Sequence, residues 1–208
     1  MSGRRGVFIT IEGMDGSGKS TQARLLADAL GAQLTREPGG SAGGEQIRRL
    51  LVEGDAGRWS PETEILLFTA ARRDHVERIV QPALDAGRVI ISDRFADSTR
   101  VYQGAARAGL RGKVDLLHEA MIGLEPDLTF VIDMDPARSL RRGLARGHGE
   151  DRFESLGLAF QEALRAGFNA LAAEFPRRVR LIDGNRPVAD IAEEVTAIAR
   201  AHLEAAHG

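Results

Sequence analysis

A glycine-rich segment near the N-terminus limits the folds open to this chain more than any other part of it. Residues 13 to 20 read Gly-Met-Asp-Gly-Ser-Gly-Lys-Ser and fit the pattern G-x-x-x-x-G-K-[ST]. The apolar run from Val7 to Ile11 ends just before this segment, and residues 20 to 30 have a helical pattern. Such a segment between a buried strand and a helix is typical of a loop that holds the phosphates of a nucleotide.

The chemistry of this loop follows from its backbone. Glycines let the chain curl so that successive N–H groups point at one anion, and the N-terminus of the next helix adds the positive end of its dipole. The ammonium of Lys19 reaches the terminal phosphates, and Ser20 supplies a hydroxyl to magnesium. The loop indicates a nucleotide donor, but many reactions use it, so the acceptor site must be sought elsewhere in the chain.

Strand and helix patterns alternate along the rest of the chain. Buried-strand patterns lie at residues 7–11, 33–35, 88–92, 128–133 and 179–182. Helical patterns lie at residues 20–30, 43–53, 60–84, 97–107, 113–123, from 136, 154–174 and from 187. The alternation predicts an α/β fold with a five-stranded parallel sheet covered on both faces. Ligands bind such sheets at the carboxyl ends of the strands, where most of the glycine clusters also fall.

Charge and composition exclude several classes of function. The 28 basic and 30 acidic residues nearly balance at a net charge of −2, which argues against nucleic acid or a membrane surface as a partner. Cysteine is absent, so disulfides, thiolate nucleophiles and cysteine-based metal sites are excluded. The apolar run at residues 7–11 is too short for a signal-peptide core or a membrane span, and we expect a cytoplasmic protein.

Asp93 and Arg94 are candidates for the acceptor side because they follow the predicted strand at residues 88–92. An arginine at this edge of the sheet can hold a phosphate with two N–H groups, and an aspartate can hold magnesium or its waters. The alternative is a structural ion pair at the surface. The presence of the phosphate-binding loop, near the same carboxyl edge of the predicted sheet, favours the first interpretation.

Phe68 and Arg72 lie four residues apart on the helix predicted to start at Ser60, so they share one face of it. An aromatic ring beside a guanidinium can stack on a planar base while the guanidinium donates to the base edge. Taken alone, Phe68 is more often a core residue than a ligand contact.

A third candidate is an arginine-rich segment. Arg138, Arg142 and Arg146 stand at i, i+4 spacing, with Arg141 alongside and Arg152 beyond a group of glycines. Like charges at this spacing weaken an isolated helix, so an anion laid across them would stabilise it. A flexible segment that closes over a triphosphate would stabilise charge on the transferring group and exclude water. The alternative is a solvated basic face.

In order along the chain, these segments resemble the thymidylate kinase family. The resemblance is carried by residues 11–20, 35–40 (Thr-Arg-Glu-Pro-Gly-Gly), 67–72 (Leu-Phe-Thr-Ala-Ala-Arg), 93–94 with 98–99, 102–104 (Tyr-Gln-Gly) and 126–129 (Pro-Asp-Leu-Thr). It extends from residue 7 to about residue 153, and the C-terminal third matches only in its helix and strand pattern. The resemblance implies a three-layer α/β/α P-loop NTPase fold in a single kinase domain, residues 1–208, with an arginine-rich LID at about 138–153.

The resemblance also implies a reaction and its substrates. The γ-phosphate of ATP would be transferred to dTMP to give dTDP, with Mg²⁺ as cofactor and a homodimer as the assembly. ATP would bind at the loop residues, which are Gly13, Met14, Asp15, Gly16, Ser17, Gly18, Lys19 and Ser20. The residues implied in catalysis are Lys19, Asp15, Arg94, Arg142 and Arg146.

The same resemblance assigns dTMP to six residues, which are Asp15, Phe68, Arg72, Arg94, Thr99 and Tyr102. Asp15 would contact the 3′-hydroxyl and Arg94 the phosphate. Phe68 would stack on thymine, while Arg72 and Thr99 would read its edge. Tyr102 would crowd the 2′ position and favour deoxyribose. Ser20, Asp93 and Glu37 would organise magnesium, partly through water.

The sequence departs from the family pattern at two places. Some members carry an arginine within the phosphate loop, but residues 14 to 17 are Met, Asp, Gly and Ser, so the catalytic arginines must come from residues 138 to 152. Phe95 stands where Tyr or His is usual after Asp-Arg, so any polar role at that position is lost.

Two other functions stay open at this point. One is a related kinase for another nucleotide or nucleoside. The other is an ATP-driven switch, in which Asp133 or Asp135 after the strand at 128–133 would activate water. A GTPase switch is disfavoured because neither lysine, Lys19 or Lys113, lies in an [NT]-K-x-D motif.

Overall fold

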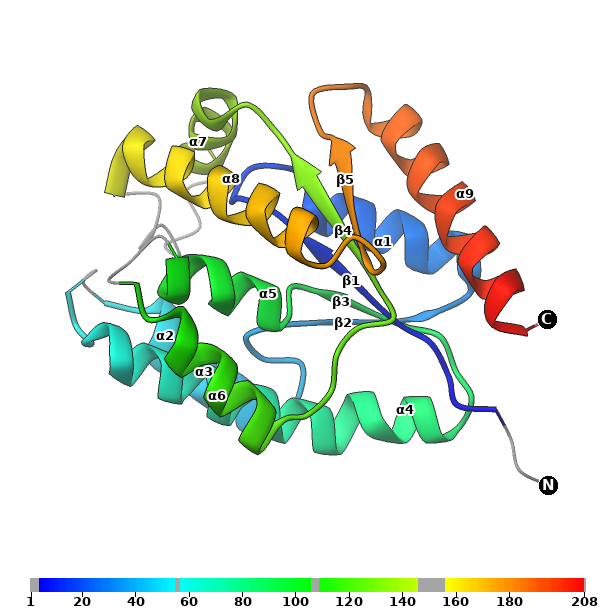
Figure 1. Ribbon diagram of the computed structural model, residues 1–208, viewed down its shortest axis with the longest axis horizontal. Coiled ribbons are helices and arrows are strands. Elements are labelled where there is room, and N and C mark those ends of the chain that lie inside the picture. The colour runs from blue at the N-terminus through cyan, green and yellow to red at the C-terminus, as the bar shows by residue number, and fades with distance from the viewer. Residues whose placement is uncertain (1–3, 55–56, 106–108, 146–155, 208) are drawn as a thin grey trace.

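The computed structural model describes residues 4–54, 57–105, 109–145 and 156–207 as three layers around one parallel sheet (Figure 1). The strands are β1 (Phe8–Glu12), β2 (Gln33–Arg36), β3 (Ile90–Asp93), β4 (Leu128–Asp133) and β5 (Val179–Asp183). Their order is β2-β3-β1-β4-β5, and every neighbouring pair is parallel. The predicted five-stranded parallel sheet is therefore confirmed, with small shifts at the strand ends.

Helices cover both faces of the sheet. One face is covered by α1 (Lys19–Leu30) and α9 (Val188–His207), and α8 (Gly157–Glu174) lies on the other face (Figure 1). The remaining helices are α2 (Ala42–Val52), α3 (Pro61–His75), α4 (Gln81–Asp85), α5 (Ala96–Thr99), α6 (Arg111–Met121) and α7 (Pro136–Leu144). Two π-helical turns, η1 (Val76–Val80) and η2 (Arg100–Ala105), complete the described elements.

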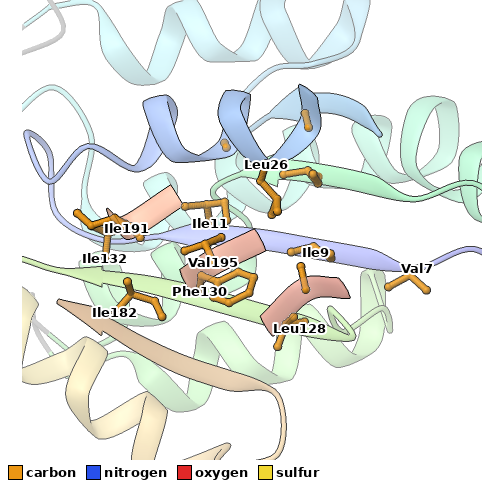
Figure 2. Close-up of a cluster of buried hydrophobic side chains, with 14 residues drawn as sticks. Val7, Ile9, Ile11, Leu26, Leu128, Phe130, Ile132, Ile182, Ile191 and Val195 are labelled. Carbon is orange, nitrogen blue, oxygen red and sulfur yellow. The ribbon is translucent and has the colours of Figure 1, made fainter. Parts of the chain in front are cut away.

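The central strand β1 supplies side chains to the apolar clusters on both faces of the sheet, because successive residues of a strand point to opposite faces. Ile9 and Ile11 pack against Leu26 of α1 and Val195 of α9 (Figure 2). Phe8 points to the other face and packs edge-on against Phe95, with ring centroids 4.9 Å apart. Burial on both faces explains why residues 7–11 are β-branched or aromatic throughout and do not alternate with charged residues.

Two predicted helices differ from the structure because π-helical turns interrupt them. The helix expected over residues 60–84 starts as predicted, with the Ser60 hydroxyl accepting from the Thr63 N–H at 3.2 Å, but becomes π-helical at η1. Pro82 has no N–H to donate to the carbonyl of residue 78, and the Gln81 N–H donates five residues back to Val76 instead. The helix expected over 97–107 is likewise divided into α5 and η2.

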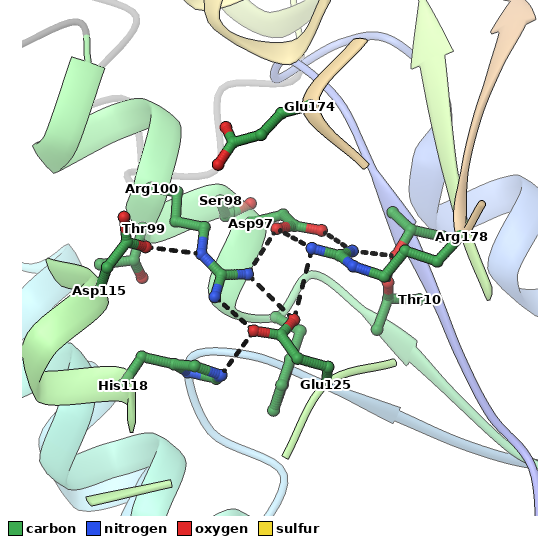
Figure 3. Close-up of polar contacts among 12 residues, drawn as sticks. Thr10, Asp97, Ser98, Thr99, Arg100, Asp115, His118, Glu125, Glu174 and Arg178 are labelled. Carbon is green, nitrogen blue, oxygen red and sulfur yellow. Dashed lines mark hydrogen bonds and ion pairs between the residues drawn. The ribbon is translucent and has the colours of Figure 1, made fainter. Parts of the chain in front are cut away.

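Buried ion pairs fix α5 against the segment that precedes β5 (Figure 3). Asp97 accepts from Arg100 Nη1 at 2.9 Å and from Arg178 Nη2 at 3.0 Å. Burial would raise the pKa of this carboxyl, but the two arginines hold it below its usual value. Arg178 also donates to the Thr129 hydroxyl of β4 at 3.1 Å. Because removal of one partner would leave a buried charge, this group holds α5 against the starts of β4 and β5.

Glu12 joins the end of β1 to the chain that follows β3. Its buried carboxylate accepts from the backbone N–H of Phe95 at 2.7 Å and from the Ser98 hydroxyl at 2.5 Å. Burial, together with the nearby charge of Asp97, raises the pKa of Glu12 to about 7, although the charge of Arg94 opposes the shift. The carboxyl group therefore fixes the start of α5 relative to β1.

The raised pKa of Glu12 predicts a pH-dependent stability. Between about pH 4.5 and pH 7 the unfolded chain loses the Glu12 proton while the folded chain retains it, so the free energy of unfolding falls as pH rises. We expect a fall of up to about 3 kcal/mol relative to Glu12→Gln, which cannot titrate. Urea unfolding followed by the fluorescence of Trp59, the single tryptophan, measures both proteins from pH 5 to pH 8. If the free energies of unfolding of the two proteins changed with pH in the same way, Glu12 would have an ordinary pKa in the folded chain.

Candidate active site

The phosphate-binding loop connects β1 to α1 and is covered by α7. Gly16 has a φ of +85°, and a Cβ there would lie 2.1 Å from the Ser139 carbonyl oxygen of α7. Only glycine therefore permits this approach. The Ser139 hydroxyl donates to the Asp15 carbonyl at 2.7 Å, so the loop and the first turn of α7 are joined directly. The buried Ser17 hydroxyl has no hydrogen-bond partner among the described residues.

Asp15 brings two cations together within this loop. Its Oδ1 accepts from Lys19 Nζ at 2.9 Å and from Arg94 Nη2 at 2.5 Å. Burial would raise the pKa of Asp15, but the charges of Arg94 and Lys19 outweigh burial and hold the pKa far below its usual range. The carboxylate is thus ionised at neutral pH and bridges an ammonium of the loop to a guanidinium that follows β3.

Arg94 is held in a strained conformation at the end of β3. Its φ is +73°, the only positive φ of a non-glycine residue in the described ranges, and costs about 1–3 kcal/mol. Arg94 Nη1 donates to the Gly13 carbonyl at 3.1 Å and to the Ser98 hydroxyl at 2.8 Å. Its guanidinium lies 5.0 Å from the ring centroid of Tyr102, whose hydroxyl donates to Asp15 Oδ2 at 3.0 Å. Four expected site residues, Asp15, Lys19, Arg94 and Tyr102, therefore meet.

A second group forms around Arg72 on α3. Arg72 is 3% exposed, and its Nη2 donates to the Thr99 hydroxyl at 2.8 Å and to the Phe95 carbonyl at 3.2 Å. Its guanidinium lies 5.2 Å from the ring centroid of Phe95, so an aromatic ring at this position supports Arg72. Phe68 is half-buried one turn earlier on α3. One helix joins the two groups, because Ser98 of α5 contacts Arg94 and Thr99 contacts Arg72.

Glu37, which the sequence predicts to help organise magnesium, is bonded to two side chains of α3. Its Oε2 accepts from Arg72 Nε at 2.8 Å, and its Oε1 is bonded to His75 Nδ1 at 2.9 Å. Both oxygens of this buried carboxylate are thus used by protein side chains. The structure places Glu37 beside Arg72, and its described partners are this arginine and His75.

Asp93 and Ser20 fit a magnesium ion better. Asp93 Oδ1, at the carboxyl end of β3, is buried and has no hydrogen-bond partner in the part of the chain that the structure describes. Ser20 lies in the first turn of α1. Among the described residues no group of three or more His, Asp or Glu side chains could hold a metal alone. Magnesium commonly takes one or two protein ligands and completes its shell with phosphate and water oxygens, which suits this pair.

The described part of the arginine-rich segment lies against the phosphate-binding loop. A Cβ at Gly18 would lie 3.9 Å from Arg142 Nη2, so this guanidinium is next to the loop. Arg138 instead donates to the Asn185 carbonyl at 2.9 Å, after β5. The other expected arginine, Arg146, and the rest of the expected LID from residue 146 on lie outside the described residues.

The two carboxylates considered for an ATP-driven switch are engaged in structural contacts. Asp133 binds Arg165 of α8 through both oxygens, each at 2.7 Å. Asp135 is the N-cap of α7 and accepts from the Arg138 N–H at 2.8 Å. Neither arrangement resembles a carboxylate that orients a water molecule, so the structure favours phosphate transfer over that alternative.

Sequence analysis missed Glu12, Ser98 and His75, which hold the expected residues in place. The sequence contained a pattern that could have indicated two of them, Glu12 and His75. Glu12 is an acidic residue at the end of a buried-strand pattern, where an unpaired charge would be costly. His75 lies three residues after Arg72 and so shares its helix face. Ser98 belonged to a recognised motif, but only tertiary structure shows that its hydroxyl lies between Glu12 and Arg94.

A model of the family "Thymidylate kinase" matches residues 11–195. The thymidylate kinase of Dinoroseobacter shibae is 67% identical over 197 residues, covering 92% of this chain and 95% of the relative. That of Ruegeria pomeroyi is 61% identical over 208 residues, covering 98% of each. The crystal structure of thymidylate kinase from Ehrlichia chaffeensis superposes with a TM-score of 0.78 at 32% identity, covering 94% of this chain and 99% of that one.

These matches extend over the sheet, the phosphate-binding loop and the groups around Arg94 and Arg72, and they confirm both the predicted fold class and the resemblance drawn from the motifs. The chain belongs to the thymidylate kinase family, which phosphorylates dTMP to dTDP with ATP.

Proposed function

We propose that this chain transfers the γ-phosphate of ATP to dTMP with the residues that surround Asp15. The observation that carries the proposal is the convergence of Lys19 and Arg94 on one carboxylate, at 2.9 and 2.5 Å. Lys19 belongs to the loop that would bind the donor, and Arg94 follows a different strand, on the side of α3 and α5. A donor phosphate and an acceptor phosphate bound to these two cations would lie next to each other.

The donor would bind along residues 13–20 with its phosphates at the N-terminus of α1. The N–H groups of the loop and the Lys19 ammonium would hold the β- and γ-phosphates. Arg142, which lies beside Gly18, would add positive charge from α7. Arg146 is proposed to act with it on the strength of the resemblance alone.

The acceptor would bind between α3 and α5. Arg94 would hold the dTMP phosphate, and the contact between Tyr102 and Asp15 supports a sugar site there, with Asp15 on the 3′-hydroxyl. Phe68 would stack on the base. Arg72 and Thr99, which already share a hydrogen bond of 2.8 Å, would face the base edge.

The chemistry requires little proton transfer, because the attacking phosphate oxygen of dTMP is already an anion. Catalysis is then mainly positioning and charge stabilisation, in which holding both reactants at attack distance can supply about 7–11 kcal/mol. Lys19, Arg94 and Arg142 would balance the charge on the transferred group. Ser20 and Asp93 would hold Mg²⁺, which when bound neutralises charge on the phosphate oxygens.

We further propose that two copies of the chain associate through α3 and α6. The two helices run side by side, joined by Lys113 Nζ and Glu62 Oε1 at 3.1 Å and by Arg73 Nη1 and the Met121 carbonyl at 2.8 Å. Their outer face carries Leu66, Leu116 and Met121, which are 57%, 66% and 52% exposed. Apolar side chains this exposed on adjacent helices support a subunit interface.

Among the described residues no helix is long and apolar enough to cross a membrane, and we propose the cytoplasm as the compartment of the reaction.

The first prediction from the proposed function concerns the reaction itself. In a coupled assay of ADP release, turnover should depend on dTMP and be much slower with dUMP, dCMP, AMP or thymidine. Lys19→Ala should lower kcat by about 10²–10³ or more, because it removes a preorganised donor to the transferred group. Equal ADP release with and without any acceptor would favour an ATP-driven switch, and faster turnover with another acceptor would favour a related kinase.

The second prediction concerns the base pocket. Arg72→Ala should raise the KM for dTMP about 10- to 100-fold, as expected for the loss of a charged hydrogen bond, and leave the KM for ATP nearly unchanged. Steady-state kinetics with each substrate varied in turn measures both constants. An unchanged KM for dTMP would contradict the pocket formed by Phe68, Arg72 and Thr99.

The third prediction concerns assembly. The wild-type protein should have twice the 22.5 kDa chain mass by light scattering, and Leu116→Asp should shift it to the chain mass. Leu25→Asp is the matched control, because Leu25 is 37% exposed on α1, away from the proposed interface. A wild-type monomer, or a dimer unaffected by Leu116→Asp, would argue against this interface.

A further inference from the structure

A buried chain of polar contacts lies behind Arg72 and begins in β2. The Thr35 hydroxyl is bonded to His75 Nε2 at 2.7 Å, and His75 Nδ1 is bonded to Glu37 Oε1 at 2.9 Å. The other oxygen of Glu37 accepts from Arg72 Nε at 2.8 Å. His75 is fully buried, and Arg72 and Glu37 are 3% and 6% exposed. These contacts give Thr35 and Glu37, two residues of the motif at 35–40, a common structural part.

The direction of each hydrogen bond follows from the charges. Burial would raise the pKa of Glu37, but Arg72 and His75 hold it below the usual value, so Glu37 is a carboxylate and can only accept. His75 Nδ1 must therefore carry a hydrogen and donate it to Glu37. His75 Nε2 is bonded to the Thr35 hydroxyl, so the two contacts together fix the orientation of the ring.

The loop after β2 closes over this group. Gly40 has a φ of +81°, and a Cβ there would lie 2.6 Å from the Thr35 hydroxyl oxygen and 2.8 Å from His75 Cδ2. Both the backbone conformation and the approach require glycine. The backbone of the loop therefore packs directly against the contact between Thr35 and His75.

The guanidinium of Arg72 is planar, so fixing part of it aims the rest. Glu37 holds Nε, while Thr99 and the Phe95 carbonyl hold both N–H groups of Nη2. The third nitrogen, Nη1, makes no hydrogen bond with the described residues and is the one free to reach a ligand. Its direction depends on Glu37, and the position of Glu37 depends on His75.

We propose that Thr35, His75 and Glu37 are positioning residues that aim Arg72 Nη1 at the base of the acceptor nucleotide. This inference rests on the proposed function, in which Arg72 reads the base edge. It assigns base recognition to β2 as well as to α3. It also gives Glu37 a part in acceptor binding in place of the expected part in magnesium binding.

The test compares variants of His75 in the full-length chain. His75→Ala should raise the KM for dTMP about ten-fold and leave the KM for ATP within about two-fold of wild type, because Arg72 loses its orientation and the donor loop is untouched. His75→Asn should restore most of the wild-type KM, since its side-chain amide takes the place of Nδ1 and can donate to Glu37. Thr35→Val, which removes only the outermost hydroxyl, should give a smaller rise and is the variant to use if His75→Ala does not fold.

A double-mutant cycle separates positioning from a general structural role. If His75 acts through Arg72, adding His75→Ala to Arg72→Ala should raise the KM for dTMP no further. Val195→Ala is the matched control for lost stability, because Val195 is buried on the opposite face of the sheet. It should lower the urea midpoint measured by Trp59 fluorescence and leave the KM for dTMP unchanged.

Three outcomes would overturn the inference. One is a His75→Ala protein whose two KM values rise together, and another is a loss of stability with both constants unchanged. The third is a cycle in which the two substitutions multiply their effects. If Arg72→Ala raises the KM for dTMP and His75→Ala does not, the positioning role alone fails. If Arg72→Ala has no effect either, the proposed base pocket fails with it.

Discussion

The Asp15 carboxylate holds the site together because it keeps two cations of like charge close to each other. Without an anion between them, the Lys19 ammonium and the Arg94 guanidinium would repel by a few kcal/mol in this partly buried setting. The attraction between Asp15 and these two cations also lowers the pKa of the carboxyl group, although burial alone would raise that pKa. Phosphate groups carry the charge that such a pair of cations attracts, and so one carboxylate defines where donor and acceptor would meet.

The order of the strands makes this meeting possible. β1 lies between β3 and β4, and Ile11 pairs with Asp93, so the loop after β1 and Arg94 after β3 leave the sheet side by side. Glu12 then ties the two strand ends together through Phe95 and Ser98. The strained φ of Arg94 persists because these contacts hold it from several directions. The sheet therefore acts as a rigid frame for groups that are far apart in sequence.

The features that could be predicted from the sequence are those that depend on residues close together in the chain. Strand runs, the Ser60 cap and the loop between a strand and a helix at residues 13–18 depend on neighbouring residues, and the structure confirms these elements. The π-helical turns at η1 and η2 could not be predicted, because the periodicity of the side chains hardly changes across one wide turn. Nor could the partners of Glu37, since Arg72 is 35 residues away and reaches it only when α3 packs beside β2. A carboxylate in a motif predicts an anion near the site, whereas tertiary packing decides which cation it binds.

The two halves of the site differ in how firmly they are held. On the proposed acceptor side, three residues are almost fully buried and bonded to one another, namely Arg72, Glu37 and His75. Asp97 of α5 is in turn held by Arg100 and Arg178. On the donor side, Arg142 is only half-buried on α7, and its described polar partner is the weakly accepting Met134 sulfur at 3.7 Å. A base is distinguished by hydrogen bonds whose direction must be fixed before it binds, whereas a phosphate chain attracts positive charge from any direction. The rigid half therefore suits selection of the acceptor, and the less constrained arginine suits stabilisation of charge that changes during transfer.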